Sequence, residues 1–365
     1  MAALQKRARM ITTSTLTRQP LDAALAGSWQ WQLSQAITDP RELLRLLDLD
    51  PQQTVGPAML AAEAFRLRVP RGFVRRMRRG DPCDPLLLQV LPGARELIQT
   101  PGFGADPLEE RAAARAPGLL QKYFGRALLI STGACAVHCR YCFRREFPYA
   151  EADQRGRWRS ALEAIAADPS LEEIILSGGD PLSLTDARLR QLTDALQAMP
   201  HIRRLRLHTR TPIVLPERID SGFLSWLETL PWPTVIVLHA NHANEIDAEV
   251  RDAASRLRMA GATLLNQSVL LAGINDSVEA LEALSQALWS AQVLPYYLHL
   301  LDRVRGTAHF EVPEPQAQVI MAHLASRLPG FLVPRLVRES AGAPAKTIVA
   351  SAPWDTLHSS GQFEC

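Results

Sequence analysis

The sequence lacks the features that would attach the chain to a membrane or carry it across one. No run of 18 apolar residues occurs in the 365-residue chain, although 47% of its residues are hydrophobic, so we expect no transmembrane helix. Residues 1–20 include basic side chains but no apolar segment typical of a secretory signal. We therefore expect a cytoplasmic protein that makes no membrane contact.

The sequence also lacks an excess of one charge and a disulfide framework. The 40 Lys and Arg residues nearly balance the 38 Asp and Glu residues, which argues against a dedicated nucleic-acid-binding protein. Seven arginines gather in residues 66–80, where a solvated basic face is favoured over RNA contact. The five cysteines are an odd number, with Cys83 in a proline-flanked stretch and Cys365 at the last position. This pattern fits a reducing compartment.

Three cysteines within eight residues are the most informative feature that is present: Cys135, Cys139 and Cys142. Three thiolates with this spacing can bind three irons of a 4Fe–4S cluster and leave the fourth iron open, whereas structural clusters are normally closed by four cysteines. The same cysteines together with His138 could instead bind zinc, and the spacing alone leaves that alternative open.

Short β-rich runs recur regularly through the middle of the chain. After a first run near Leu129 they centre near Ile175, Leu205, Ile236, Leu265 and Leu298, at steps of 30, 31, 29 and 33 residues. Helical patterns lie between them at 157–167, 186–199, 245–260 and 277–291. A strand, a helix and two loops need about 30 residues, so the sequence predicts an α/β fold with a parallel sheet. Six such units indicate a partial (β/α)6 barrel, with its active site at the carboxyl ends of the strands.

The first 120 residues favour short helices. Asp39 is typical of a helix N-cap, Pro40 of the first helical position and Glu42 of the first turn, ahead of an apolar face of leucines. We predict a mainly helical N-terminal region over residues 1–120, the barrel over 121–340, and a last segment with a short tail over 341–365.

The cysteine motif and a downstream turn together resemble the radical S-adenosylmethionine (SAM) enzymes. The segment 176–182, Leu-Ser-Gly-Gly-Asp-Pro-Leu, resembles the turn that holds the SAM amino group in that family. A glycine pair after a strand indicates only a turn, but both motifs in this order are far more specific. The resemblance implies that the three cysteines hold a 4Fe–4S cluster and that the turn contacts SAM through Ser177, Gly178, Gly179 and Asp180.

Further blocks extend the resemblance over nearly the whole chain: 121–123, 139–149, 241–246, 264–271, 295–302 and 339–346. Together they resemble the lysine 2,3-aminomutase family, most closely the bacterial branch that makes β-lysine for the modification of elongation factor P. The resemblance implies an isomerase that uses a 4Fe–4S cluster, SAM and pyridoxal phosphate (PLP) to convert free L-lysine into β-lysine. It also implies an electron donor such as flavodoxin or ferredoxin, and an indirect link to elongation factor P through its β-lysine ligase.

The same resemblance implies a role for individual side chains. Lys346 would carry PLP, Arg144 would pair with the substrate carboxylate, and Asp302 and Glu339 would clamp the distal ammonium. Arg126 and Gln267 would contact PLP or SAM, and His239 would stack on PLP. An ordinary core histidine is an equally good interpretation of His239, and a surface arginine is the alternative for Arg144.

The chain also departs from the family pattern, and other functions compete. Glutamate stands at 339 where the fermentative members have aspartate, and alanines with Pro344 replace consecutive glycines before Lys346. Only 19 residues follow Lys346, without a cysteine cluster, so we expect no zinc and a different oligomer interface. The alternatives are an aminomutase for glutamate or arginine, a radical SAM enzyme without PLP, and a zinc-stabilised RNA-binding adaptor.

Overall fold

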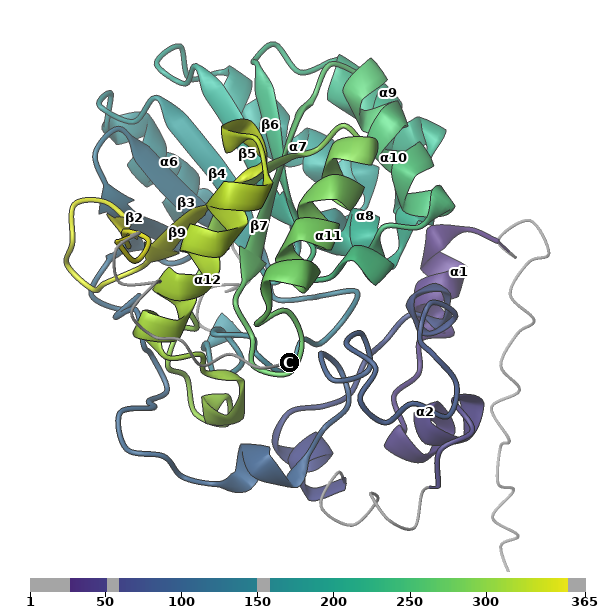
Figure 1. Ribbon diagram of the computed structural model, residues 1–365. Helices are drawn as coiled ribbons and strands as arrows, with labels where there is room; N and C mark the ends of the chain where they lie inside the picture. The colour runs from purple at the N-terminus through teal and green to yellow at the C-terminus, as the bar shows by residue number, and fades with distance from the viewer. Residues whose placement is uncertain (1–26, 51–58, 150–157, 354–365) are drawn as a thin grey trace, which may run out of the picture.

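A ten-stranded sheet forms the centre of the α/β fold, and its spatial strand order from β1 to β10 is the order of the chain (Figure 1). The computed structural model describes residues 27–50, 59–149 and 158–353. The strands are β1 (Ala114–Ala116), β2 (Leu119–Tyr123), β3 (Arg126–Thr132), β4 (Glu173–Gly178), β5 (Arg204–Thr209), β6 (Thr234–His239), β7 (Thr263–Val269), β8 (Leu294–His299), β9 (Arg335–Arg338) and β10 (Thr347–Ile348). Strands β3 to β9 are parallel, and antiparallel strands border them at both ends.

The six strands expected from the regular spacing are confirmed as β3 to β8. The sequence analysis did not anticipate β9, which continues the parallel sheet, or the short border strands β1, β2 and β10. These border strands are partly exposed and carry polar residues, so they lack the apolar run by which a buried parallel strand is recognised.

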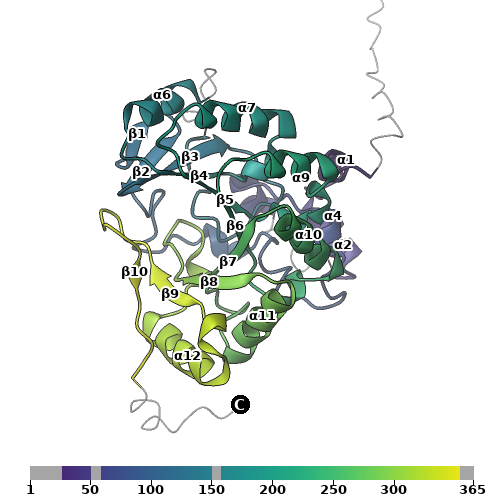
Figure 2. The same ribbon diagram turned by 90° about the horizontal axis from the view of Figure 1, so that it is seen from above.

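Figure 2 shows the sheet as a curve with helices along its outer side. They are α6 (Arg159–Ala167), α7 (Asp186–Gln197), α9 (Ser221–Glu228), α10 (Ala248–Met259), α11 (Val278–Ser290) and α12 (Glu314–Arg327). Side chains alternate between the two faces of a strand. In β5, Leu205 and Leu207 are therefore buried in the main core, while Arg206 and His208 face a cavity on the inner side.

Capping side chains set the limits of the predicted helices. The pattern at 245–260 becomes α10 only from Ala248, because the Asp247 carboxylate accepts the backbone N–H of Val250 at 2.9 Å. The pattern at 277–291 becomes α11 after Ser277, which caps it in the same way. Helix α6 begins at Arg159, and residue 157 of the predicted pattern lies outside the described residues.

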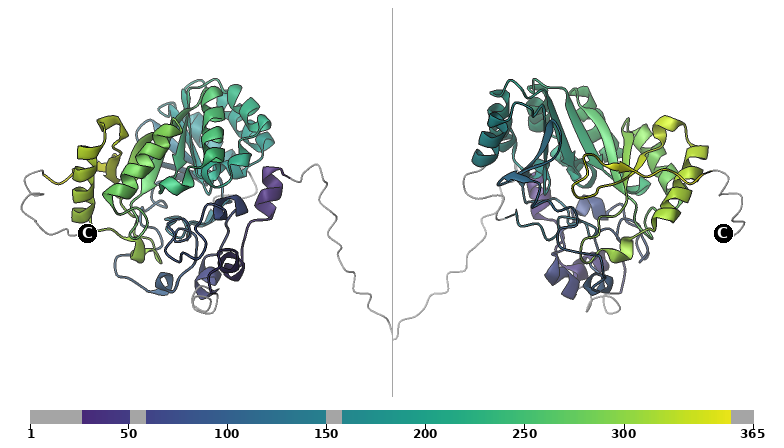
Figure 3. Two further views of the ribbon diagram at one scale, coloured as in Figure 1. Left: turned by 45° about the vertical axis from the view of Figure 1, so that its right-hand side comes forward. Right: turned by 90° about the vertical axis from the view of Figure 1, so that its left-hand side faces the viewer.

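The N-terminal region packs at the carboxyl ends of the strands (Figure 3). Its helices are short: α1 (Trp29–Ser34), α2 (Pro40–Leu46), α4 (Arg71–Val74) and the 3-10 helix η2 (Ala94–Leu97). The predicted N-cap is confirmed, since the Asp39 carboxylate accepts the N–H of Arg41 at 2.9 Å. Phe73 of this region shares a buried core with Ala136 and Val137 of the cysteine loop.

Short connecting helices also lie between the strands and the outer helices. They are η3 (Pro181–Ser183), α8 (Thr211–Val214), η4 (Pro216–Arg218), η5 (Ala243–Glu245), η6 (Ala308–Phe310) and η7 (Gly330–Leu332). The predicted boundary at residue 120 falls inside β2, and the boundary at 340 falls between β9 and β10. The division into regions stays a prediction.

The arginines of residues 66–80 make contacts within the fold. Arg76 pairs with Asp247 at 2.7 Å, and Arg71 pairs with Glu42. Longer pairs join Arg75 to Glu249 at 3.7 Å and Arg79 to Asp48 at 3.6 Å. Across the part of the chain that the structure describes, no helix is long and apolar enough to cross a bilayer.

Candidate functional site

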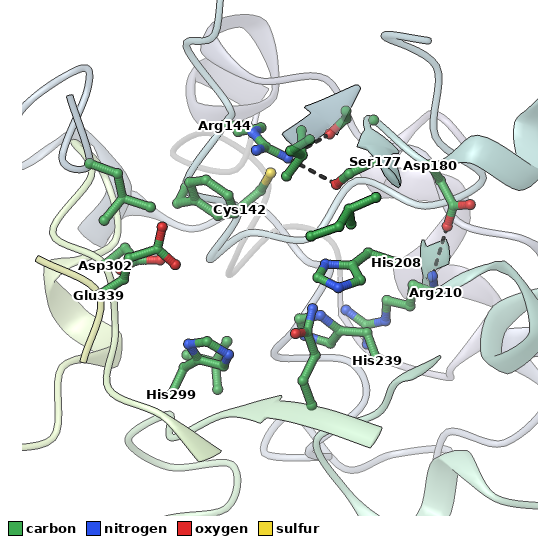
Figure 4. A pocket seen from close by; sticks show the side chains of 18 of the residues that line it. Cys142, Arg144, Ser177, Asp180, His208, Arg210, His239, His299, Asp302 and Glu339 are labelled. Carbon is green, nitrogen blue, oxygen red and sulfur yellow. Dashed lines mark hydrogen bonds between the residues drawn. The ribbon is translucent and has the colours of Figure 1, made fainter. Parts of the chain in front are cut away.

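One cavity of about 700 Å³ lies on the inner side of the sheet and brings together every site residue predicted from the sequence. Figure 4 shows part of it, with Asp302 and Glu339 on one side and Arg210 and His239 on the other. The predicted residues that line it are Arg126, Cys135, Cys139, Cys142, Arg144, Ser177, Gly178, Gly179, Asp180, His239, Gln267, Asp302, Glu339 and Lys346. The curvature of the sheet therefore gathers side chains that span 220 positions of the sequence.

The three clustered cysteines are unpaired, partly buried thiols in the loop after β3. Burial raises the pKa of Cys142 to about 11, with a further contribution from the neighbouring Cys139 thiol. Burial and the other two thiols also raise the pKa of Cys135. Three thiolates at such close range need a cationic partner to be stable together.

Within residues 27–50, 59–149 and 158–353, no group of three His, Cys, Asp or Glu side chains is placed to hold a single metal ion. In a 4Fe–4S cluster each cysteine binds a different iron, whereas zinc would need its four ligands around one ion.

The turn after β4 packs directly against the cysteine loop. Gly178 has a φ of +114°, and a Cβ at Gly179 would lie 2.4 Å from the carbonyl oxygen of Ala134. The N–H of Gly179 donates to Thr132 O at 2.7 Å, and that of Asp180 donates to Ala134 O at 2.8 Å. The glycine pair is thus required for the turn to reach the loop that carries the cysteines.

The Asp180 carboxylate is fully occupied within the protein. Its Oδ1 accepts the Leu182 N–H at 3.0 Å and the Thr209 hydroxyl at 2.7 Å. Its Oδ2 accepts the N–H groups of Arg210 at 2.7 Å and Thr211 at 3.0 Å. Four donors fill the four lone-pair sites of a carboxylate. Asp180 therefore holds the ends of β4 and β5 together, which the sequence analysis did not anticipate for this predicted SAM contact.

A chain of alternating charges begins at Lys346 and crosses the cavity. Lys346 pairs with Glu339, and the other oxygen of Glu339 lies 2.8 Å from Nζ of Lys122. Lys122 Nζ also lies 3.5 Å from Glu110, which binds Arg144. Burial raises the pKa of Glu339, but Lys346 and Lys122 outweigh it and hold that pKa at about 2. Glu110 and Lys122 are site residues that the sequence analysis missed, because their partners lie far away in the sequence.

Glu110 occupies one edge of the Arg144 guanidinium. Arg144 Nε and Nη2 donate to the two Glu110 oxygens at 2.8 and 2.7 Å. Its Nη1 donates to Ser177 Oγ at 3.1 Å and to Gly178 O at 3.4 Å. Arg144 is buried and firmly held, so the alternative of a free surface arginine is wrong.

Asp302 lies beside Glu339 (Figure 4), but the pKa of its carboxyl is shifted in the opposite direction. Burial, together with the charge of Glu339, raises the pKa of Asp302 from 3.8 to about 7. Among the described residues Asp302 makes no ion pair, although Lys346 and Lys122 are close enough to lower its pKa in part. Of the carboxylates that line the described cavity, Asp302 is therefore the one without a cation or hydrogen-bond donor on its oxygens.

Three half-buried histidines on strands β5, β6 and β8 line the cavity, and two of them were not predicted. His239 contacts Tyr141, with Nε2 3.4 Å from the Tyr141 hydroxyl and the two rings stacked. The Nε2 atoms of His208 and His299 are buried without a hydrogen-bond partner in the described structure. Burial lowers the pKa of all three, that of His299 to about 3, so they are neutral at physiological pH. Unpartnered buried nitrogens of this kind indicate a site for a polar ligand.

The sequence relatives described here all carry the name L-lysine 2,3-aminomutase. No protein-family model matches the chain. The chain is 49% identical over 341 residues to the L-lysine 2,3-aminomutase of Escherichia coli (strain K12), covering 93% of this chain and 97% of that protein. It is 46% identical to the L-lysine 2,3-aminomutase of Haemophilus influenzae, covering 88% and 96%. With the L-lysine 2,3-aminomutase of Clostridium subterminale the identity is 33%, covering 88% and 78%.

A solved structure of a radical SAM methyltransferase from Sphaerobacter thermophilus aligns with a TM-score of 0.43 at 18% identity, over 61% of this chain and 71% of that one. The relatives from E. coli and H. influenzae are similar to this chain along 97% and 96% of their own length. The chain therefore belongs to the radical SAM L-lysine 2,3-aminomutase family, a family of isomerases.

Proposed function

We propose that this protein converts L-α-lysine into β-lysine by moving the amino group from C2 to C3, with a 4Fe–4S cluster, SAM and PLP as cofactors. The observation that carries the proposal is the single cavity that joins three free thiols to Lys346 and two carboxylates. Three sequence relatives that share the name L-lysine 2,3-aminomutase support the reaction.

The cysteines and the adjoining turn would hold the cluster and SAM. Cys135, Cys139 and Cys142 would each bind one iron, and the backbone of the Gly178–Gly179 turn borders the space beside them. When bound, the cluster and SAM supply a radical able to abstract hydrogen from an unactivated carbon. The chain contributes a cavity whose walls keep water away from that radical.

Lys346 and two further basic side chains would hold PLP. Lys346 would supply the amine, and Lys122 and Arg126 line the same cavity as cations suited to a phosphate. The neutral nitrogens of His208 and His299 offer polar contacts to the ring. When bound, PLP supplies an aromatic system that delocalises an unpaired electron.

The charges of the site favour a substrate with a distal ammonium. Asp302 would pair with the ε-ammonium of lysine, because Glu339 is already shared by Lys122 and Lys346. The substrate carboxylate would bind Arg144 by displacing the Nη1 contacts to Ser177 and Gly178, since Glu110 occupies the Nε–Nη2 edge. A glutamate substrate would place a second carboxylate against Asp302, which is strongly unfavourable in a buried site.

Several wider properties belong to the same proposal. We propose that the curved sheet is a partial (β/α)6 barrel preceded by a helical region, and that the protein acts in the cytoplasm without zinc. Flavodoxin or ferredoxin would supply electrons, and the β-lysine would serve the modification of elongation factor P. These further proposals are supported by the resemblance of the sequence blocks to the lysine 2,3-aminomutase family.

An anaerobic assay with reductant, SAM, PLP and a panel of amino acids tests the proposed function. We expect lysine to be converted faster than arginine or glutamate, in a protein that shows both iron–sulfur and PLP absorbance. Faster conversion of glutamate would contradict the substrate assignment. Iron–sulfur absorbance without PLP would favour another radical SAM enzyme, and zinc with neither chromophore would favour the adaptor.

A further inference from the structure

A buried polar network lies directly behind one of the three cysteines. Arg210 Nη1 donates to the Cys139 sulfur at 2.8 Å, while Nη2 donates to Gln89 Oε1 at 2.7 Å and to Glu245 Oε2 at 3.0 Å. Nη1 also contacts the Tyr141 hydroxyl. We call Gln89, Tyr141, Arg210, Asn241 and Glu245 the Arg210 network; Figure 4 shows Arg210 at the edge of the cavity.

The other members of the Arg210 network hold one another in place. Asn241 Nδ2 donates to Gln89 Oε1 at 2.9 Å and to the Tyr141 hydroxyl at 2.7 Å. Glu245 Oε1 accepts the backbone N–H of Asn241 at 2.8 Å and the side chain of Gln89 at 3.1 Å. Gln89, Asn241 and Glu245 are all 0% exposed. The sequence block 241–246 thus serves this network, a role that its sequence did not indicate.

Asp180 and Glu245 fix the position of Arg210. The saturated Asp180 carboxylate accepts the backbone N–H of Arg210, and Glu245 forms the only buried ion pair that Arg210 makes in the described residues. A buried ion pair rarely stabilises a fold more than apolar residues of the same size would. Stability alone therefore gives no reason for a guanidinium at this place, whereas a contact to a thiol does.

We propose that Arg210 is a positioning residue that sets the reduction potential of the iron–sulfur cluster through its hydrogen bond to Cys139. The proposal rests on the cluster binding described under the proposed function. One electron from an external reductant makes the cluster more negative, and a hydrogen bond or positive charge at a ligand sulfur stabilises that reduced form. Arg210 therefore raises the reduction potential, and Glu245 partly offsets this by neutralising Arg210.

Removing the charge of Arg210 and removing that of Glu245 should shift the reduction potential in opposite directions. In Arg210→Gln the reduced cluster loses a charged hydrogen bond, so its stability relative to the oxidised form should fall about tenfold, which is about 59 mV towards negative potential for a one-electron couple. In Glu245→Gln the guanidinium is no longer neutralised, so the potential should move in the positive direction. Damage to the fold would not produce shifts of opposite sign.

The measurement is a potentiometric titration of the reconstituted full-length protein without SAM, followed by electron paramagnetic resonance, with iron and sulfide content determined for each variant. Arg218→Gln is the matched control, because Arg218 is likewise buried (0% exposed, against 7% for Arg210) and bound to a carboxylate, Asp186, but does not contact a cysteine. Its potential should equal that of the wild type.

Each result decides the inference. An unchanged potential in Arg210→Gln at full iron content, or shifts of the same sign in both network variants, would overturn it. If Arg210→Gln does not retain the cluster, the sign of the shift in Glu245→Gln alone decides. A wild-type protein that binds no iron would instead overturn the proposed function on which the inference rests.

Discussion

Replacing Asp302 with asparagine should stabilise the substrate-free protein, and more so at alkaline than at acidic pH. The pKa of this carboxyl is raised from 3.8 to about 7 by burial and by Glu339 and Glu110, against the opposing effect of Lys346 and Lys122. Because the folded protein holds the proton more tightly than the unfolded chain, ionisation opposes folding. The penalty is absent below pH 4, grows between pH 4 and 7, and is complete above pH 7.

The size of the effect follows from the shift of about three pKa units. At about 1.4 kcal/mol for each unit, the penalty reaches at most about 4 kcal/mol at pH 8 and about 1.6 kcal/mol at pH 5. Asparagine carries no charge at either pH. The free energy of unfolding of Asp302→Asn relative to the wild type should therefore rise by up to about 2.4 kcal/mol between pH 5 and pH 8.

Urea unfolding at the two pH values measures this difference without any cofactor or substrate. Asp168→Asn is the control, because Asp168 is an exposed carboxyl whose pKa is lowered by hydrogen bonds from Ser170. That variant should gain nothing at pH 8. An Asp302→Asn variant with the same relative stability at pH 5 and pH 8 would refute the reasoning. Added L-lysine should stabilise the wild type at pH 8 and leave the variant unaffected.

Three further predictions concern the cofactors and the turn beside them. Alanine in place of any one of the three clustered cysteines should abolish the 4Fe–4S absorbance and SAM cleavage, whereas Cys83→Ala, at an exposed thiol, should keep both; a fully active Cys139→Ala protein would contradict the cluster assignment. Borohydride reduction of the PLP-loaded protein followed by peptide mapping should place the pyridoxyl label on Lys346, and a label on another lysine would show the wrong segment was assigned. Gly179→Ala should lower the free energy of unfolding by about 1–3 kcal/mol through overpacking against Ala134, and Gly93→Ala, where a Cβ meets nothing within 4 Å, should not.

The strands that could be predicted from the sequence are those whose packing leaves a local signal. Strand β4 (Glu173–Gly178) is buried along its whole length, so its apolar residues form a short continuous run. Strand β9 (Arg335–Arg338) has arginines at both ends and only two buried residues, which is too short to distinguish from a loop. Its place in the sheet depends on pairing with β8, a contact that no local pattern indicates.

The residues of the candidate site likewise divide into those with a local sequence signal and those without one. The cysteines and Lys346 stand in recognisable motifs, so the sequence indicated them. Glu110 and Lys122 are recognised as site residues only through ion pairs with residues 34 and 217 positions away, respectively. The sequence also suggested that Asp180 contacts SAM, and a motif does not show that four nearby donors already fill its carboxylate.

The contacts of the cysteine loop have a consequence for how the protein is made. His138 Nδ1 lies 2.8 Å from the carbonyl oxygen of Arg66, 72 positions earlier, and Arg140 Nε donates to Glu96, 44 positions earlier, at 2.8 Å. Contacts between such distant residues form late in folding, since long loops must close first. The loop therefore takes its final shape only after the N-terminal region has packed against it. If the three cysteines hold a 4Fe–4S cluster, as proposed, their thiols are open to oxidation until the cluster is bound.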